Sequence, residues 1–151
     1  MRFFIFLFFL LFANLVLADL IKPNPNLLPQ EVISIQLLAL KNNNQPYSDA
    51  GIEQTWEFAH PSNRKYTGPL FNFKKMMYSN NYSLILNHIE HNIISVRNDQ
   101  NISFFFVEIF DKTGNKFGFQ WIVQKVLFDE KFNNCWMTIS VSEPILLSKT
   151  T

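Results

Sequence analysis

The period of the apolar residues changes near residue 90, and this change most constrains what the chain can fold into. Before it, apolar side chains recur at helical spacing, as at Ile33, Leu37 and Leu40. After it, aromatic and β-branched residues alternate with polar ones, in runs separated by short polar loops. Helices followed by hairpin-connected strands predict an α+β fold, with N-terminal helices packed on a curved antiparallel four-stranded sheet.

Proline and capping residues indicate where the helices begin and end. We expect helices over 29–41, from Ser48 or Asp49 to His60, and from a Thr67 cap towards Asn80, then a short helical turn over 82–86. The second helix should end at His60, because Pro61 disfavours helical geometry in the residue before it. The polar residues 62–66 are expected to form a loop.

Four later segments have the composition and alternation of strands. They cover 93–96, 102–110, 117–128 and 135–141. The third strand is apolar on the face that carries Phe117, Phe119, Trp121 and Val123. The same alternation in the fourth strand groups Cys135, Met137, Ile139 and Val141. One face of the sheet is therefore apolar, and the helices are expected to cover it.

Residues 1–18 have the pattern of a secretory signal peptide, with cleavage expected after Ala18. An uncleaved membrane anchor is the alternative, although the apolar run is short for a span. We expect an extended lead-in over 19–28, a single α+β domain over 29–145 and a C-terminal tail over 146–151. The mature protein is then expected in the secretory pathway or secreted and free of the membrane. A plastid reached through that pathway is the alternative location.

Charge and cysteine content restrict the partners. The chain has 13 Lys and Arg and 12 Asp and Glu, and loss of Arg2 with the signal peptide makes the two counts equal. We expect no binding to nucleic acid, because that needs a basic surface. Cys135 is the single cysteine, so no internal disulfide can form, and a buried thiol is expected. Asn81 and Asn101 begin N-glycosylation sequons.

Several short segments carry a family resemblance. They are Gln36–Leu40, Gly51–Ile52, Phe58–Arg64, Thr67–Leu70, Phe73–Met77 and Cys135–Thr138. In order and spacing they resemble the domain-of-unknown-function 4864 family, within the nuclear-transport-factor-two-like superfamily. The resemblance implies a cone-shaped α+β domain but no reaction, because that family has no assigned activity. His60 departs from the family pattern, since members often have serine there.

The run from Trp56 to Pro69 is the densest in special-purpose residues, and Asn63 and Arg64 lie in it between two expected helices. In one interpretation Arg64 bridges free carbonyls at the end of the preceding helix. In the other, its guanidinium holds a carboxylate or phosphate through two parallel hydrogen bonds. The residues expected at a ligand pocket are Trp56, His60, Asn63, Arg64, Tyr66, Trp121 and Met137.

No group of residues demands a metal, a cofactor or catalysis. His60, His88 and His91 lack a compact second pair of ligands, so no metal site is expected, and we expect no cofactor. The resemblance nevertheless implies that an enzyme of this superfamily would place an acid or histidine inside the cone, where burial tunes its pKa. The acids near apolar elements are Glu53, Glu57, Glu108 and Asp111.

Three functions remain open from the sequence. The first is non-catalytic binding of a small apolar or amphipathic ligand, or of a protein partner. The second is an isomerase or dehydratase that uses an acid or histidine in the cone. The third is a scaffold that forms a homodimer through the outer face of its sheet. The fold alone does not choose among them.

Overall fold

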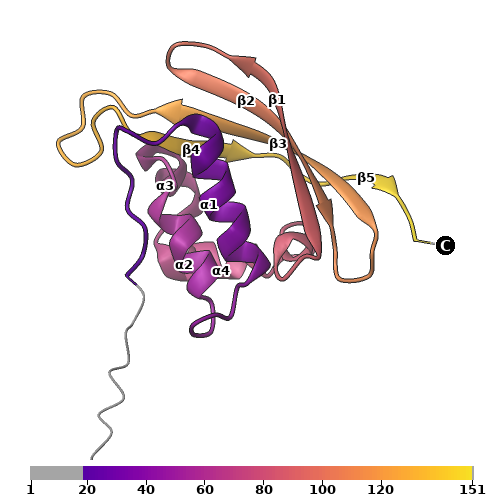
Figure 1. The fold of residues 1–151 in the computed structure, drawn as a ribbon. Coiled ribbons are helices and arrows are strands. Elements are labelled where there is room, and N and C mark those ends of the chain that lie inside the picture. The colour runs from indigo at the N-terminus through magenta and orange to yellow at the C-terminus, as the bar shows by residue number, and fades with distance from the viewer. Residues whose placement is uncertain (1–18, 151) are drawn as a thin grey trace, which may run out of the picture.

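The computed structural model describes residues 19–150, so the expected signal peptide and its cleavage after Ala18 lie outside the described residues. The helices are α1 (Pro29–Lys41), α2 (Ala50–Glu57), α3 (Pro61–Thr67), α4 (Leu70–Met77) and the 3₁₀ turn η1 (Ser83–Ile85). The strands are β1 (Glu90–Asn98), β2 (Ile102–Phe110), β3 (Lys116–Lys125), β4 (Trp136–Val141) and β5 (Ile145–Ser148). The helices precede a curved antiparallel sheet, which confirms the expected α+β fold (Figure 1).

All strand pairs of the sheet are antiparallel, in the order β1-β2-β3-β4, with β5 paired to β3 as well. β4 pairs with the end of β3 at 121–125, and β5 pairs with its start at 116–118. The fifth strand falls largely in the segment expected as a tail, so the count of four strands was wrong by one. All four β5 residues are exposed, and a strand without a buried face has no apolar alternation to signal it.

The core lies between α1 and the inner face of β2 and β3. Alternate residues of β2 are buried, and Phe105, Val107 and Ile109 pack in one cluster with the α1 side chains Ile33, Leu37 and Leu40. Phe119, Trp121 and Val123 of β3 belong to the same cluster, which confirms the expected apolar face of that strand. Each such side chain contributes about 1.5–3 kcal/mol by leaving water.

The fourth strand turns a different face to the core than its sequence predicted. Thr138 pairs with Val123 and Ser140 with Ile122, so Ile139 is an extra residue that forms a bulge. Because paired residues share a face, Thr138 lies on the inner side with Val123, and Met137 lies on the opposite side with Gln124. The bulge then returns Val141 to the inner side, opposite Trp121.

A helix replaces the loop expected over 62–66. α2 ends at Glu57, and Pro61 is the first residue of α3, where its missing N–H costs nothing. The His60 side chain caps this helix, because its Nδ1 accepts a hydrogen bond from the Ser62 backbone N–H at 3.1 Å. Pro61 thus separates two helices instead of starting a loop. No residue of α3 is buried.

The turn between α3 and α4 also differs from expectation. Thr67 is the last residue of α3 and not the cap of the next helix, and its hydroxyl donates to the Asn63 carbonyl at 3.2 Å. Gly68 has φ of 76°, a left-handed value that favours glycine, and Pro69 is the N-cap of α4. This turn sets the direction in which α4 leaves α3.

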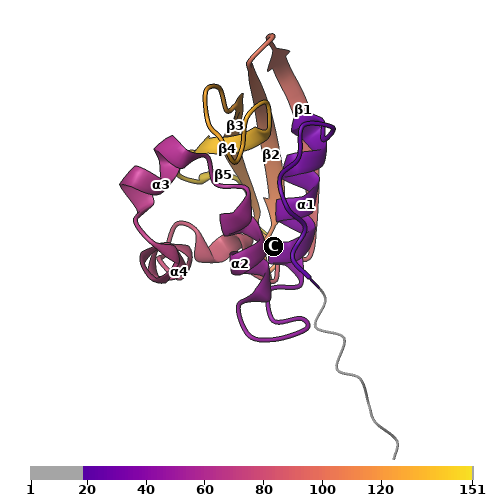
Figure 2. The same ribbon diagram turned by 90° about the vertical axis from the view of Figure 1, so that its left-hand side faces the viewer.

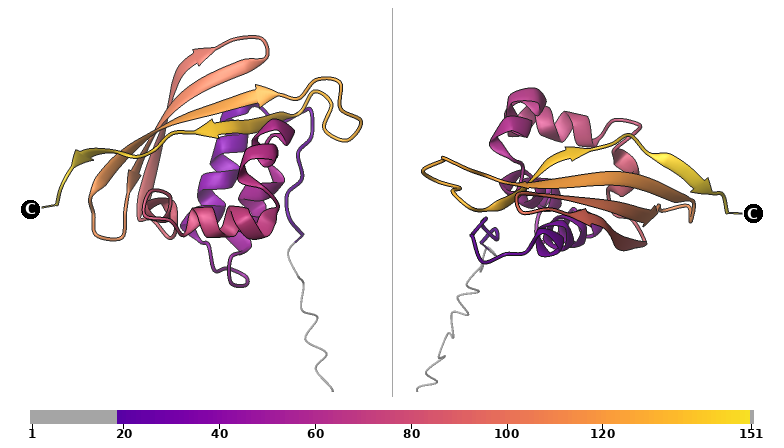
Figure 3. Two further views of the ribbon diagram at one scale, coloured as in Figure 1. Left: turned by 180° about the vertical axis from the view of Figure 1, so that it is seen from behind. Right: turned by 90° about the horizontal axis from the view of Figure 1, so that it is seen from above.

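The helices lie together on one side of the sheet in Figure 1. Figure 2 shows α1 on one side of this layer and α3 with α4 on the other. The lead-in runs beside the helices in Figure 3, and Ile21 is held there because its N–H and C=O both bond the Gln54 side chain at 2.8 Å. Within residues 19–150, no helix has both the length and the apolar character that a bilayer span requires.

Candidate functional site

A pocket of about 380 Å³ lies between the helices and the inner face of β3 and β4. Its deep wall is apolar and buried, and comprises Leu40, Phe73, Met77 and Ile85. Its outer lining is partly exposed and includes Asn63, Tyr66 and Thr67 of α3 and Ser140 of β4. This volume falls in the range of small-molecule sites.

Four residues joined by hydrogen bonds form the polar floor of the pocket. The Thr138 hydroxyl donates to Gln36 Oε1 at 2.6 Å and accepts from Trp121 Nε1 at 3.0 Å. Gln36 Nε2 donates in turn to the Thr55 backbone carbonyl at 3.1 Å, and the Thr55 hydroxyl donates to the Gly51 carbonyl one turn earlier in α2 at 2.8 Å. The four floor residues, Gln36, Thr55, Trp121 and Thr138, are all buried. These hydrogen bonds fix the orientation of the Gln36 amide and of the Thr138 hydroxyl.

Tyr82 closes the wall between η1 and β4. Its hydroxyl donates to the Val141 carbonyl at 3.1 Å, and its ring lines the pocket. Burial raises the pKa of the Tyr82 hydroxyl, so it stays a neutral donor at physiological pH.

Three of the seven residues expected at a pocket line it, namely Asn63, Tyr66 and Trp121. Trp121 contributes to the buried floor, whereas Tyr66 is 90% exposed at the mouth. The Asn63 amide donates to the Thr138 carbonyl at 3.4 Å and so links α3 to β4. Trp56, His60, Arg64 and Met137 are not among the lining residues.

The contacts of Arg64 confirm the interpretation that it bridges carbonyls at the end of the preceding helix. Its guanidinium donates to three carbonyls at the end of α2 and just after it, those of Trp56 at 2.8 Å, Glu57 at 3.1 Å and Ala59 at 3.0 Å. It also lies 4.5 Å from the centre of the Trp56 ring. Burial lowers the pKa of Arg64 from its ordinary value. Its hydrogen-bonding fork is thus used within the fold.

Met137 packs away from the pocket. It is fully buried in a second, smaller cluster with Val126, Phe132 and Cys135. Cys135 is buried as expected, and burial raises the pKa of its thiol, which disfavours the reactive thiolate. This cluster fixes the loop between β3 and β4.

None of the four acids considered for catalysis lines the pocket. Glu53 pairs with Lys74 at 2.8 Å, Glu57 with Lys22 at 3.0 Å and Glu108 with Lys116 at 2.7 Å. Asp111 holds the β2–β3 turn, because its carboxylate accepts from the backbone N–H groups of Thr113 and Asn115. Each acid therefore has a structural partner elsewhere.

Buried His88 and half-buried His91 form a hydrogen-bonded pair beside η1. His88 Nδ1 donates to the Ile85 carbonyl at 2.6 Å, so its Nε2 accepts from His91 Nδ1 at 2.7 Å. Burial lowers the pKa of His88 to about 4, and burial and Lys41 lower the pKa of His91. Within residues 19–150, no three His, Cys, Asp or Glu side chains could share a metal ion.

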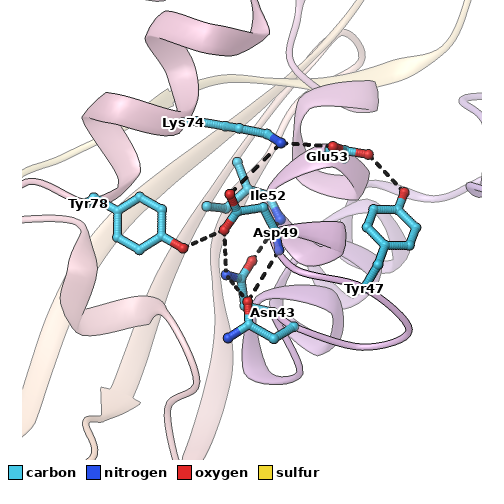
Figure 4. A network of polar contacts seen from close by, with 8 residues as sticks. Asn43, Tyr47, Asp49, Ile52, Glu53, Lys74 and Tyr78 are labelled. Carbon is cyan, nitrogen blue, oxygen red and sulfur yellow. Dashed lines mark hydrogen bonds and ion pairs between the residues drawn. The ribbon is translucent and has the colours of Figure 1, made fainter.

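A polar network fixes α4, one wall of the pocket, against α2 (Figure 4). Lys74 lies between Glu53 and Asp49, at 2.8 and 3.9 Å, and the Tyr78 hydroxyl donates to Asp49. The hydrogen bond from Lys74 lowers the pKa of Glu53. Buried Asn43 joins the network through Asp49 at 3.3 Å. These contacts fix the position of α4, which carries Phe73, Met76 and Met77 of the lining.

Gln36 and Thr138, the two central floor residues, were not among the residues expected at the pocket from the sequence. A signal for Gln36 exists, because it is a polar residue within the apolar stripe of α1 and is buried. A buried polar side chain needs a partner, so its position points to a site inside the fold. Thr138 had no such signal, since the bulge that turns it inward is not visible in the sequence.

Comparison of the chain with family models, with curated proteins and with solved structures found no significant match.

Proposed function

We propose that the protein binds a small apolar or amphipathic ligand in this pocket without catalysing a reaction. One observation carries the proposal: no carboxylate, imidazole, thiol, amine or guanidinium belongs to the lining, although the pocket is large enough for a ligand. The lining combines an apolar wall with a few fixed polar groups, which is the usual composition of small-molecule sites.

The chemistry of the lining argues against the isomerase or dehydratase alternative. General acid–base catalysis requires a group that can exchange a proton within hydrogen-bond reach of the substrate. The titratable groups of the lining are the hydroxyls of Tyr66 and Tyr82. Tyr82 already donates to a carbonyl, and the raised pKa of its hydroxyl keeps it protonated at neutral pH, so it is not available as a base. The resemblance to the cone-shaped superfamily is compatible with a binding role.

Binding of Nile red, a neutral dye that fluoresces in apolar sites, tests the proposal. The protein used is the chain from Asp19 onward, because residues 19–150 contain every element and pocket residue described. Thr67→Trp places a large side chain in the lining, whereas Lys65→Trp places it at an exposed position of the same helix outside the lining. We expect saturable binding that the first variant abolishes and the second retains. Equal binding by both variants, or none by the wild type, would refute the pocket.

A homodimer through the sheet is a second proposal, favoured by the outer face of β2. Phe104, Phe106 and Phe110 lie there half-buried, opposite the buried set of that strand. Arg97 and Lys116 cover two of these rings, at 4.4 and 5.4 Å from their centres. Sedimentation velocity of the chain from Asp19 onward tests this proposal, and a monomer at high concentration would exclude it.

Secretion is likewise a proposal, and the two sequons give it a test. Asn81 and Asn101 are both exposed in the fold, at a turn and beside the β1–β2 hairpin. Expression of the intact chain in eukaryotic cells should yield a product that shifts on treatment with an N-glycosidase. A fluorescent fusion distinguishes secretion from the alternative, a plastid reached through the secretory pathway.

A further inference from the structure

We propose that the ligand is uncharged and enters with its polar group first, accepting a hydrogen bond from Gln36 on the pocket floor. This inference rests on the proposed function and names the chemistry of its ligand. It follows from two properties of the pocket: the charge of its lining and the hydrogen bonds that its floor leaves unused.

The lining favours a neutral ligand because it offers no counter-charge. An ion that leaves water for a buried site needs an opposite charge or several strong hydrogen bonds to replace its hydration. No Lys, Arg, His, Asp or Glu side chain lines the pocket. Arg64 lies on the same helix as Asn63, but three backbone carbonyls already occupy its fork. A carboxylate or ammonium ligand would therefore be buried without compensation.

Gln36 supplies the contact that orients the ligand. Its side chain is 1% exposed and lines the pocket, so any partner it gains must come from inside. Its Nε2 carries two N–H groups, and one of them donates to Thr55. The other has no acceptor among the residues that the structure describes. A hydroxyl, ether or carbonyl oxygen of the ligand fits this donor.

The position of Gln36 sets the direction of binding. The floor is the buried end of the pocket, whereas Tyr66 and Ser140 stand at the exposed end. Phe73, Met77 and Ile85 offer an apolar wall for the rest of the molecule. A ligand with one polar end and an apolar body is thus buried head-first, unlike a detergent-like ligand that keeps its head in water.

Displacement of Nile red by four ligands of one chain length tests this chemistry on the wild-type protein from Asp19 onward. The ligands are decanol, decanoate, decylammonium and decanethiol. We expect decanol to bind about tenfold or more tightly than either ion, because only the ions are buried unpaired. We also expect decanol to bind more tightly than decanethiol. In a purely apolar pocket the order of these two would reverse, since the thiol is a weak acceptor and leaves water more easily.

The outcomes separate the inference from the proposed function. If decanoate or decylammonium binds as tightly as decanol, or decanethiol binds more tightly, the inference fails while the pocket stands. If Nile red and decanol both fail to bind, the proposed function and this inference both fail. Gln36→Met should remove the preference for decanol over decanethiol. Gln54→Met is the matched control, because Gln54 is also buried and bonds backbone groups but lies outside the pocket. The wild-type ligand series decides the question even if the first variant does not fold.

Discussion

Gln36 of α1 and Thr138 of β4 are 102 residues apart in the chain and share a hydrogen bond of 2.6 Å. Through this contact the first helix is joined to the strand that bounds the pocket. The same hydroxyl accepts from Trp121 of β3, so three elements meet at one oxygen atom. The stability of the fold and the shape of the pocket floor therefore depend on the same side chain.

Thr138→Val should lower the free energy of unfolding by about 2 kcal/mol or more, because the Trp121 N–H loses its acceptor and Gln36 a donor in a buried site. Urea denaturation measures this change. Thr67→Val is the matched control, since that half-buried hydroxyl makes one hydrogen bond within its own helix. We expect an effect below about 0.5 kcal/mol there. Equal effects for the two variants would contradict the role of Thr138.

Arg64→Lys should lower the free energy of unfolding by about 2 kcal/mol, although the charge is kept. A lysine ammonium is a single point donor and cannot reach three carbonyls in the geometry of the guanidinium fork. Chemical denaturation checks this prediction. Lys65→Arg, the opposite exchange at the next residue, is exposed and should change stability by less than about 0.5 kcal/mol. An unchanged stability for Arg64→Lys would show that the carbonyls do not need this side chain.

The His88–His91 pair should make the protein less stable in acid. His88 has its ordinary pKa of 6.5 when unfolded and a pKa of about 4 in the fold, so the unfolded chain binds the proton first. The contribution of His88 is complete above pH 6.5 and is lost as the pH falls towards 4, by about 2 kcal/mol at about pH 5.

Carboxylates also affect stability in acid, so the contribution of His88 needs a separate measurement. Titration of its imidazole signals by NMR provides this measurement. The His88 ring should stay neutral in the folded protein until about pH 4. Its protonation would set an N–H against the N–H of His91, which now donates to it. A His88 signal that titrates near the ordinary value of 6.5 would contradict the burial of His88.

Ser103→Ala should raise the free energy of unfolding by up to about 1 kcal/mol. Ser103 is 1% exposed, and its hydroxyl has no hydrogen-bond partner among residues 19–150. Removal of a buried, unpaired hydroxyl removes its desolvation cost. Ser103 also completes the sequon of Asn101, so the comparison requires unglycosylated protein. Ser95→Ala, at an exposed site of β1, is the control, and a loss of stability at Ser103 alone would contradict this prediction.

The fold could be predicted because two hydrophobic periods occupy separate halves of the chain. The α1 stripe and the inward face of β3 follow directly from the spacing of residues such as Leu37 and Phe119. The helix α3 was not predictable in this way, since none of its residues is buried. Pro61 disfavours helix in the residue before it but is also suited to the first position of a helix, so its presence does not distinguish a loop from a new helix. β5 was missed for the same reason, because its residues are exposed.

The candidate site was predicted only in part. Asn63, Tyr66 and Trp121 line the pocket, as proposed from the sequence. Arg64 lies next to Asn63 in the sequence, but its guanidinium bonds carbonyls at the end of α2, and the sequence does not show which carbonyls lie within its reach. The bulge at Ile139 decides that Thr138, and not Met137, faces inward. One inserted residue reverses the faces of a strand, so local patterns cannot identify such a floor.

The absence of buried residues in α3 has a consequence for how a ligand reaches the floor. A segment that would expose little apolar surface on local unfolding can open while the rest of the protein stays intact. α3 carries Asn63, Tyr66 and Thr67 of the outer lining, so entry need not disturb β2 or β3. Hydrogen–deuterium exchange should therefore be faster in the amides of α3 than in those of α1, and ligand should slow it. A ligand would then enter the pocket beside α3.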